Sequence, residues 1–516
     1  MENIRTAYTG RLLAGSALAS ATALAAHAAC AENNQHPNII YINADDLGVM
    51  DVHFDGRKEY RTPNLDKLAA EGMVFTNAYA PAANCAPSRA CCMSGQYTPR
   101  HGVYTVQSSA RGLTSQRKLI PIKNTKTLRD DITTIPEALK AAGYKTIALG
   151  KWHLGKDPKT QGFDINIGGD HSGGPHGGYF TPFKSGPMKK YNDEYPKGTH
   201  RAAIFADKAV KFMRENKDKA FFMYMAYYSV HSPLKPVPAL VDKYKDVENI
   251  NPVYASMIEN MDASVGKILD ELDKLGLKKK TFVLFTSDNG GVRATSNQTP
   301  YRAGKGSYFD GGIRVPMCVR WPGHVKPETK CDTPVSGVDF FPTFLEVAGI
   351  KPPKEKILDG VSLLPLLTGT GTIPKRPLFW HFPIYLQISH GQQLDFHDKY
   401  FRTRPGSAIR FGKWKLHQYF EDGRIELYDL ENDKGEKRDL AKEMPEKAKE
   451  LLAILENWRK NIHAPLPTEK NPQYDPSKTE PDKKIKKNKK TKKTKKKKSK
   501  KTKKDPTADP EKTGTD

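Results

Sequence analysis

Continuous apolar runs that alternate with helical segments set the tightest limit on the fold of this sequence. Four runs lack the polar alternation of a half-exposed strand: Asn38 to Ala44, Thr146 to Leu149, Phe221 to Tyr228, and Thr281 to Thr286. Such runs are typical of parallel strands that are buried on both faces. Helical patterns separate them, as between Pro252 and Leu275, where apolar residues recur at helical spacing. The sequence therefore predicts an α/β fold with a large, mostly parallel sheet sandwiched by helices.

Polar residues suited to metal binding or catalysis follow each of the four runs. They are Asp45 and Asp46, Lys151 and His153, His231, and Asp288 and Asn289. Each stretch alone is also compatible with a solvated turn or a packed histidine. Parallel strands place their carboxyl ends at one edge of a sheet, where functional residues collect, so the shared position favours a single site. The adjacent carboxylates and the Asp-Asn pair offer the hard oxygen ligands that calcium or magnesium takes.

The stretch Cys85-Ala86-Pro87-Ser88-Arg89 provides a candidate nucleophile. Pro87 fits the first turn of a helix, because the N–H that proline lacks would have no partner there. Cys85 then lies just before the helix start, where free N–H groups and the helix dipole favour an anion. A buried cysteine in front of an ordinary helix is the alternative for this motif alone.

The order cysteine, any residue, proline, serine, arginine resembles the signature of the type I, formylglycine-dependent sulfatases. The likeness extends from about Asn38 to Lys460 and indicates an arylsulfatase-like member of the alkaline phosphatase superfamily, with an alkaline-phosphatase-like fold. It implies that a formylglycine-generating or sulfatase-maturing enzyme oxidises Cys85 to formylglycine. The hydrated aldehyde then serves as the nucleophile, and covalent catalysis divides one hard hydrolysis into two steps.

The resemblance also implies one bound calcium ion, which would neutralise sulfate charge and polarise the S–O bonds. The residues that match its ligands are Asp45, Asp46, Cys85, Asp288 and Asn289. Arg89 matches a residue that holds the modified side chain, a task suited to a rigid guanidinium group that is always charged.

The remaining catalytic roles follow from the same resemblance. Lys151 and Lys305 match two lysines that grip the sulfate and stabilise the charge of the transition state. His153 matches the residue that takes a proton from the diol, and His231 matches the one that protonates the departing alcohol. Asp288 is expected to act in addition as the base for the attacking hydroxyl.

Substrate contacts are expected from both lysines and His231, and from three further residues, His176, His381 and Arg404. His176 lies in a loop over residues 168–180 and Arg404 ends a loop that begins at 384; such loops often determine substrate choice. Ordinary solvated loops are an equal alternative. Sulfated polysaccharides or oligosaccharides are the expected substrates, with a galactose- or N-acetylgalactosamine-type sulfate as first candidate, while the sugar and ester position stay open.

The N-terminal residues 1–30 are predicted to be a signal peptide. A basic start, a weakly apolar run and the small-residue cleavage site Ala26-His27-Ala28 indicate export to the periplasm or the medium. A lipoprotein anchor at Cys30 is disfavoured, because His27 stands where such sites want an apolar residue. Six cysteines are too few for a disulfide scaffold, although one or two bridges are possible.

Two domains and a tail are predicted after the signal peptide. Residues 36–375 form the catalytic domain, and residues 376–465 form a smaller α+β domain with a short antiparallel sheet and a final helix. Residues 466–516 form a disordered tail, in which Lys483 to Lys504 contains sixteen lysines and no acidic residue. Such a block repels itself and buries nothing. It either contacts polyanions or the cell envelope or only aids solubility, and no specific nucleic acid is expected.

Two rival functions remain at this point. Phosphatases and phosphodiesterases of the alkaline phosphatase superfamily share the expected fold, but they use serine or threonine and usually two zinc ions. A non-catalytic glycan-binding protein is the second rival, in case Cys85 is never oxidised. The set of lysines and histidines favours an active sulfatase over both.

Overall fold

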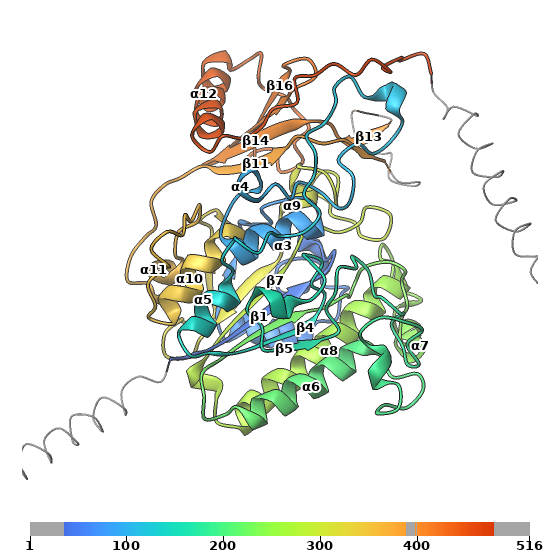
Figure 1. The fold of residues 1–516 in the computed structure, drawn as a ribbon, viewed down its shortest axis with the longest axis vertical. Coiled ribbons are helices and arrows are strands. Elements are labelled where there is room, and N and C mark those ends of the chain that lie inside the picture. The colour runs from blue at the N-terminus through green and yellow to red at the C-terminus, as the bar shows by residue number, and fades with distance from the viewer. Residues whose placement is uncertain (1–35, 389–397, 399, 479–516) are drawn as a thin grey trace, which may run out of the picture.

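The computed structural model describes residues 36–388, 398 and 400–478. A large sheet with helices on both faces forms the first part of the chain. A four-stranded antiparallel sheet and the helix α12 (Pro445–Asn461) lie beyond one end of it (Figure 1). The predicted α/β fold with a smaller α+β domain is confirmed.

The large sheet has the strand order β5-β4-β6-β1-β7-β8-β2-β9. The central strand β1 pairs in parallel with β6 and β7, so that Ile39 faces both Phe222 and Phe282, and β4 and β5 extend the parallel part. β8 runs antiparallel to β7 and β2, which makes the sheet mostly parallel. The bounds are β1 Asn38–Ala44, β2 Met73–Phe75, β4 Lys145–Gly150, β5 Ile165–Ile167, β6 Phe221–Ala226, β7 Thr281–Ser287, β8 Met317–Arg320 and β9 Thr329–Cys331.

Helices cover both faces of this sheet (Figure 1). On one face pack α2 (Pro63–Ala70), α6 (Arg201–Glu215) and α8 (Pro252–Lys274). On the other face pack α3 (Cys85–Ser94), α5 (Ile135–Ala141) and α10 (Phe340–Val347). The two apolar cores between sheet and helices explain why the central strands are apolar on both sides.

The start of α8 was predictable from its N-cap residue, whereas the start of α6 was not. The Asn251 side chain accepts the N–H groups of Val253 and Tyr254 at 3.0 and 3.1 Å, as an N-cap does. At α6 the His200 ring takes this role toward Ala202. Histidine is not a usual N-cap residue, so the prediction missed this fifteen-residue helix.

The smaller domain is fixed to the catalytic domain by a buried ion pair. Its strands are β11 Leu378–Phe382, β14 Gly406–Phe411, β15 Trp414–Tyr419 and β16 Ile425–Asp429. Lys415 of β15 lies 2.8 Å from Asp310 at the start of α9 (Asp310–Ile313) and 2.9 Å from Glu436. Such a pair is tolerated in the interior only when its charges are well bonded, and this one fixes the small domain beside the loop that carries Lys305.

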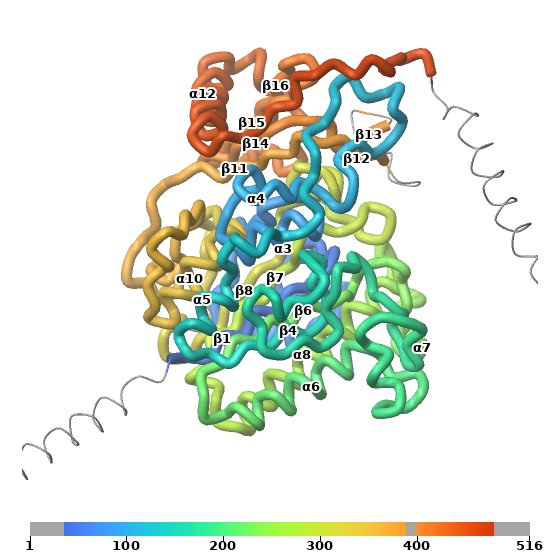
Figure 2. The backbone as a smooth tube through the Cα atoms, in the orientation of Figure 1, coloured from blue at the N-terminus to red at the C-terminus, as the bar shows by residue number. Residues whose placement is uncertain are grey.

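Residues 466–478 belong to the folded part of the chain. Lys470 forms a β-bridge with Leu119, and the Asn471 N–H donates to the Lys118 carbonyl at 2.9 Å. Figure 2 shows this red end of the tube running past the small domain. The predicted tail from 466 therefore begins too early. The lysine block, the predicted signal peptide and Cys30 lie outside the described residues.

The described cysteines, Cys85, Cys91, Cys92, Cys318 and Cys331, all carry free thiols. The bridges that the sequence left open are therefore not formed among these five. Over the described ranges, no helix combines the length and the apolar character that a membrane crossing needs.

Candidate active site

Hydrogen bonds that continue the sheet past its strand ends bring the predicted residues together. The backbone N–H groups of Asp45, Asp288 and Lys151 each donate to a carbonyl of the adjacent strand or its extension, at 2.9, 3.1 and 2.8 Å. These bonds fix the direction in which each polar segment leaves the sheet. The convergence that the sequence predicted at this edge is present in the structure.

The backbone of the site is held in unusual conformations. Gly150, with φ 93°, precedes Lys151, and a Cβ at this position would lie 1.9 Å from the Ala226 carbonyl oxygen, so only glycine fits. Asp46 and His153 have φ values of 63° and 62° although they carry side chains. Such conformations cost about 1–3 kcal/mol each and cluster at functional sites.

Cys85 is the first residue of α3 and is 2 % exposed. Its Sγ lies within 4.8 Å of carboxylate oxygens of Asp45 and Asp288. Burial raises the pKa of the thiol, but the charges of Lys151 and Lys305 outweigh this and lower it overall. The site therefore favours an anionic form of whatever group stands at this position, as a helix N-terminus also does.

Each of the two active-site lysines contacts one aspartate of the pair that follows β1. Lys151 Nζ lies 2.8 and 2.7 Å from the two oxygens of Asp45, and both side chains are 0 % exposed. Lys305 Nζ lies 2.5 Å from Asp46 Oδ1. Burial raises the pKa of Asp45 to about 7 despite the nearby lysine, whereas Lys305 and His231 overcome burial and hold the pKa of Asp46 well below its usual range.

Arg89 links α3 to the end of β7. Its Nε and Nη2 lie 2.8 and 2.7 Å from Asp288 Oδ2, and its Nη1 donates to the hydroxyl of Tyr224 at 2.9 Å. A further bond from Nη1 reaches the Lys151 carbonyl at 3.1 Å. Arg89 thus fixes the position of Asp288 relative to the Cys85 helix. Tyr224 was not predicted, because in the sequence it is one more apolar residue of a buried strand.

The donor set of the cluster fits a single hard cation. Asp45, Asp46 and His231 offer ligand atoms within 4.8 Å of one another, and so do Asp45, Cys85 and Asp288. The buried amide oxygen of Asn289 has no hydrogen-bond partner in the described part of the chain, while its Nδ2 donates to Asp46 at 2.9 Å. A buried oxygen without a donor is well suited to a metal. Oxygen donors dominate the set, as calcium requires.

Both predicted histidines lie beside this cluster. His231 Nε2 is 3.9 Å from Asp46 Oδ2, and its Nδ1 contacts the Ser232 carbonyl at 2.6 Å. Burial lowers the pKa of His231, although Asp46 acts in the opposite direction. Burial and the charge of Lys151 lower the pKa of His153 further, and its buried Nδ1 has no partner among the described residues. Burial thus favours the neutral, proton-accepting form of both rings, while at His231 the charge of Asp46 favours the protonated form that can donate.

The loop that carries His176 passes over both histidines. A Cβ on Gly173 would lie 2.6 Å from the His153 ring, and one on Gly174 would lie 3.7 Å from the His231 ring. His176 Nδ1 lies 2.6 Å from Asp170, and the side chain is about one third exposed. The 168–180 loop therefore forms a wall of the site, and His176 stands on this wall rather than in the cluster.

His381 does not lie in the site, contrary to the prediction. It is 2 % exposed, its Nδ1 contacts Ser407 at 2.8 Å, and its Nε2 contacts the Pro465 carbonyl at 2.9 Å. Burial lowers its pKa to about 3, so it stays neutral. The residue belongs to the core of the small domain, and a substrate cannot reach it.

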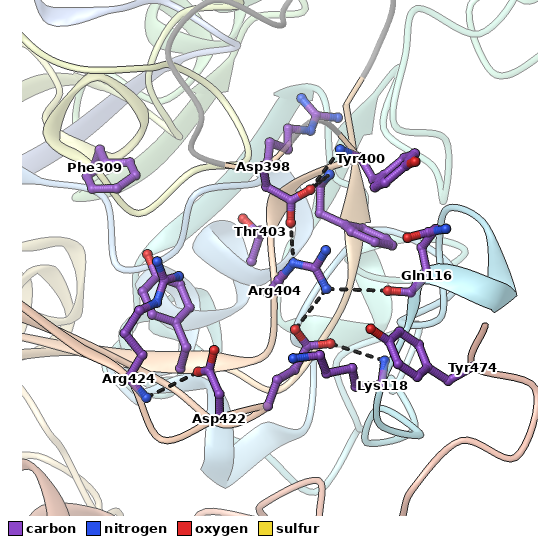
Figure 3. Close-up of a pocket in the computed structure, with 14 residues that line it drawn as sticks. Gln116, Lys118, Phe309, Asp398, Tyr400, Thr403, Arg404, Asp422, Arg424 and Tyr474 are labelled. Atoms are coloured by element: carbon purple, nitrogen blue, oxygen red, sulfur yellow. Dashed lines mark hydrogen bonds and ion pairs between the residues drawn. The ribbon is translucent and has the colours of Figure 1, made fainter. Parts of the chain in front are cut away.

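Arg404 lines a cavity of about 400 Å³ beside the site (Figure 3). It forms ion pairs with Asp398 and, at 2.8 Å, with Glu421, and it donates to the Gln116 carbonyl at 3.3 Å. Two carboxylates thus neutralise its charge. The contact that was predicted between Arg404 and an anionic substrate has no support in this geometry.

Two further arginines, Arg111 and Arg402, lie near the cluster; Arg402 was predicted as a candidate glycan contact of the 384–404 loop, and Arg111 was not predicted at all. The charge of Cys85 acts on the pKa of both. Arg402 lies in the predicted 384–404 loop, but Arg111 lies in a long, mostly irregular connection between α4 (Thr98–His101) and α5. No local pattern in the sequence could have brought Arg111 to this place.

Two family models match the chain. The first, described as sulfatase, matches residues 37–350, and the second, described as N-sulphoglucosamine sulphohydrolase, C-terminal, matches residues 304–461. Together they span the catalytic domain and the smaller domain.

Similar proteins agree with these matches. A sulfatase from Formosa agariphila is 32 % identical, over 82 % of this chain and 88 % of its own length. N-acetylgalactosamine-6-sulfatase from Rattus norvegicus is 34 % identical, over 67 % of this chain and 68 % of its own length. The crystal structure of Ps i-CgsB in complex with k-i-k-neocarrahexaose is 30 % identical and has a TM-score of 0.67, with 84 % of this chain and 95 % of that chain covered. The chain therefore belongs to the sulfatase family and is a sulfuric ester hydrolase.

Proposed function

We propose that this enzyme hydrolyses sulfate esters of polysaccharides or oligosaccharides, with Cys85, oxidised to formylglycine, as its nucleophile. The observation that carries the proposal is the position of Cys85. It stands at the N-terminus of α3, beside Asp45 and Asp288, where two lysine charges favour an anion. The modification requires a maturation enzyme of the host.

A calcium ion is part of the proposal. The residues that would hold it are Asp45, Asp46, Asp288, Asn289 and the modified Cys85. When bound, the ion supplies charge neutralisation and polarisation of the sulfate group.

The side chains of the site then have distinct tasks. Lys151 and Lys305 bind sulfate oxygens through ammonium groups that the carboxylates of the cluster hold in place, and they stabilise the charge that develops there. Arg89 keeps Asp288 oriented toward the nucleophile. His231, on the side of the 168–180 loop, gives a proton to the oxygen of the departing alcohol, and His153 receives the proton that is released when the aldehyde is regenerated.

A sulfated carbohydrate is supported as substrate by the relatives. One is named for N-acetylgalactosamine 6-sulfate, and one was solved with a neocarrahexaose. The polar 168–180 loop above His231 suits a ring rich in hydroxyl groups. We also propose that the enzyme is exported, to the periplasm or the medium, and that the lysine block holds it near polyanions, because a polycation gains affinity by releasing counterions.

The proposal is tested by sulfate release from mature enzyme. Sulfated galactans, fucans, ulvan and glycosaminoglycan fragments are offered beside a steroid sulfate and 4-nitrophenyl phosphate. We expect at least one sulfated glycan to be the best substrate in kcat/KM. Efficient turnover of the steroid sulfate, with no turnover of any glycan, would contradict the proposal that the substrate is a sulfated carbohydrate. A phosphate preferred over every sulfate would favour the phosphatase alternative.

His231→Ala is expected to lower kcat on a sugar sulfate by roughly two to four powers of ten, because a poor leaving group needs its proton. The loss on 4-nitrophenyl sulfate is expected to be much smaller, since nitrophenolate leaves without protonation. Steady-state kinetics on both substrates gives the comparison. His53→Ala serves as the control, because His53 is 42 % exposed and pairs with Asp66 outside the cluster. Equal losses on both substrates would remove His231 from the acid role.

A further inference from the structure

Arg402 is attached to the turn that carries a catalytic lysine. It lies on β13 (Phe401–Thr403), and its Nη1 donates to the Lys305 carbonyl at 2.9 Å. The contact is close, because a Cβ on Gly306 would lie 2.8 Å from Arg402 Nε. Arg402 also lines the cavity of about 400 Å³ that Figure 3 shows. It therefore stands between the catalytic cluster and an open space large enough for a sugar residue.

Arg111 approaches the same place from another segment. Its backbone N–H donates to the Tyr385 carbonyl at 3.3 Å, and a Cβ on the following Gly112 would lie 2.6 Å from the Phe401 ring. The loop of Arg111 thus packs on the hairpin of β12 (Leu386–Gln387) and β13. Burial and the charge of Arg111 lower the pKa of Arg402 to about 10, as expected for two like charges that lie near each other.

The charge of Arg111 is not compensated by the described protein. The side chain is half-buried, and in residues 36–388, 398 and 400–478 its guanidinium has no ion pair or hydrogen bond. The carboxylates of the catalytic cluster are already occupied: Asp45 by Lys151, Asp46 by Lys305, and Asp288 by Arg89. A half-buried cation of this kind is costly unless something pairs with it.

We propose that Arg111 and Arg402 bind a second anionic group of the substrate, next to the sulfate that is hydrolysed. The group is an oxyanion, either another sulfate ester or a carboxylate, on the same or the neighbouring sugar ring. Guanidinium groups match the planar, two-oxygen edge of such groups. The inference rests on the proposed function and deepens it, since it limits the substrates to glycans with closely spaced negative charges.

The test compares three matched oligosaccharides based on the best glycan substrate. One carries only the scissile sulfate, one carries a second sulfate beside it, and one carries a carboxylate there. Wild-type enzyme is expected to favour one or both doubly charged forms in kcat/KM, and the better of the two identifies the oxyanion. Arg111→Gln is expected to lower kcat/KM for that form by roughly ten- to a hundredfold more than for the singly charged form, as for the loss of a charged hydrogen bond.

Two further variants separate the role of Arg111 from a general loss of positive charge. The kcat/KM of Arg111→Lys for the doubly charged form is expected to lie between those of wild type and Arg111→Gln. Lysine keeps the positive charge but loses the paired donors of the guanidinium group. Arg129→Gln is the matched control, because Arg129 is exposed and its one ion pair within the described residues is with Asp131. Equal turnover of singly and doubly charged glycans by wild type, or equal losses on all of them in Arg111→Gln, would overturn the inference. Absence of sulfate release from every ester would instead overturn the proposed function itself.

Discussion

Cys85→Ala is expected to abolish sulfatase activity, with kcat lowered by at least about four powers of ten, as when the nucleophile of a covalent mechanism is removed. The geometry gives the reason. Asp45, Asp288 and both lysines are arranged around the first residue of α3, and without an oxygen nucleophile there they can only bind the sulfate. Activity on 4-nitrophenyl sulfate and on the best glycan is measured with mature wild-type enzyme as reference.

Mass spectrometry of the peptide that contains Cys85 completes this prediction. In active native enzyme the residue is expected to have the mass of the aldehyde. Cys331→Ala is the matched control, since Cys331 is a free, half-buried cysteine on β9, and this variant should keep full activity. A fully active sample with only the unmodified thiol at Cys85 would show that the nucleophile has been misassigned.

The sequence allowed the core of this site to be predicted because its geometry is local to the strand ends. Asp45, Lys151 and Asp288 each follow a mostly buried strand of six or seven residues, and parallel strands leave little choice about where their ends meet. Cys85 needed only a helix start with a proline two residues later, in the first turn. Each placement relative to its own strand or helix is local, and the regular pairing of parallel strands then brings the residues together.

The errors concern contacts that no local pattern encodes. His381 was assigned to the substrate because it is polar, but a partner 84 residues away, the Pro465 carbonyl, makes it a core residue. Lys470 forms a β-bridge with Leu119, so the folded chain includes the start of the segment that its composition had assigned to the tail. Arg111 reaches the site only because its loop packs on β12 and β13. Such long-range packing overrides what composition suggests.

Removal of calcium is expected to lower activity by roughly three powers of ten or more, as for loss of the charge that stabilises a developing anion. Calcium should restore the activity and zinc should not, because the cluster offers carboxylate and amide oxygens and only one histidine. Thermal unfolding gives a readout without turnover: at a calcium concentration of about a hundred times Kd, the folded state gains about 2.7 kcal/mol. Asn289→Leu is expected to lose most of this gain, and His53→Ala is expected to keep it.

Calcium affinity is also expected to fall as the pH falls below about 7. Burial holds the pKa of Asp45 at about 7, against the opposing charges of Lys151 and Arg89, with Asp46 and Cys85 adding to the rise. The ion binds the carboxylate and not the protonated acid. Each pH unit below this pKa should therefore raise the apparent Kd for calcium about tenfold. Calorimetric titration of calcium at pH 8, 7, 6 and 5 measures this slope. A Kd that is constant from pH 8 to pH 5 would mean that Asp45 is not a ligand, and that its contact with Lys151 is its only role.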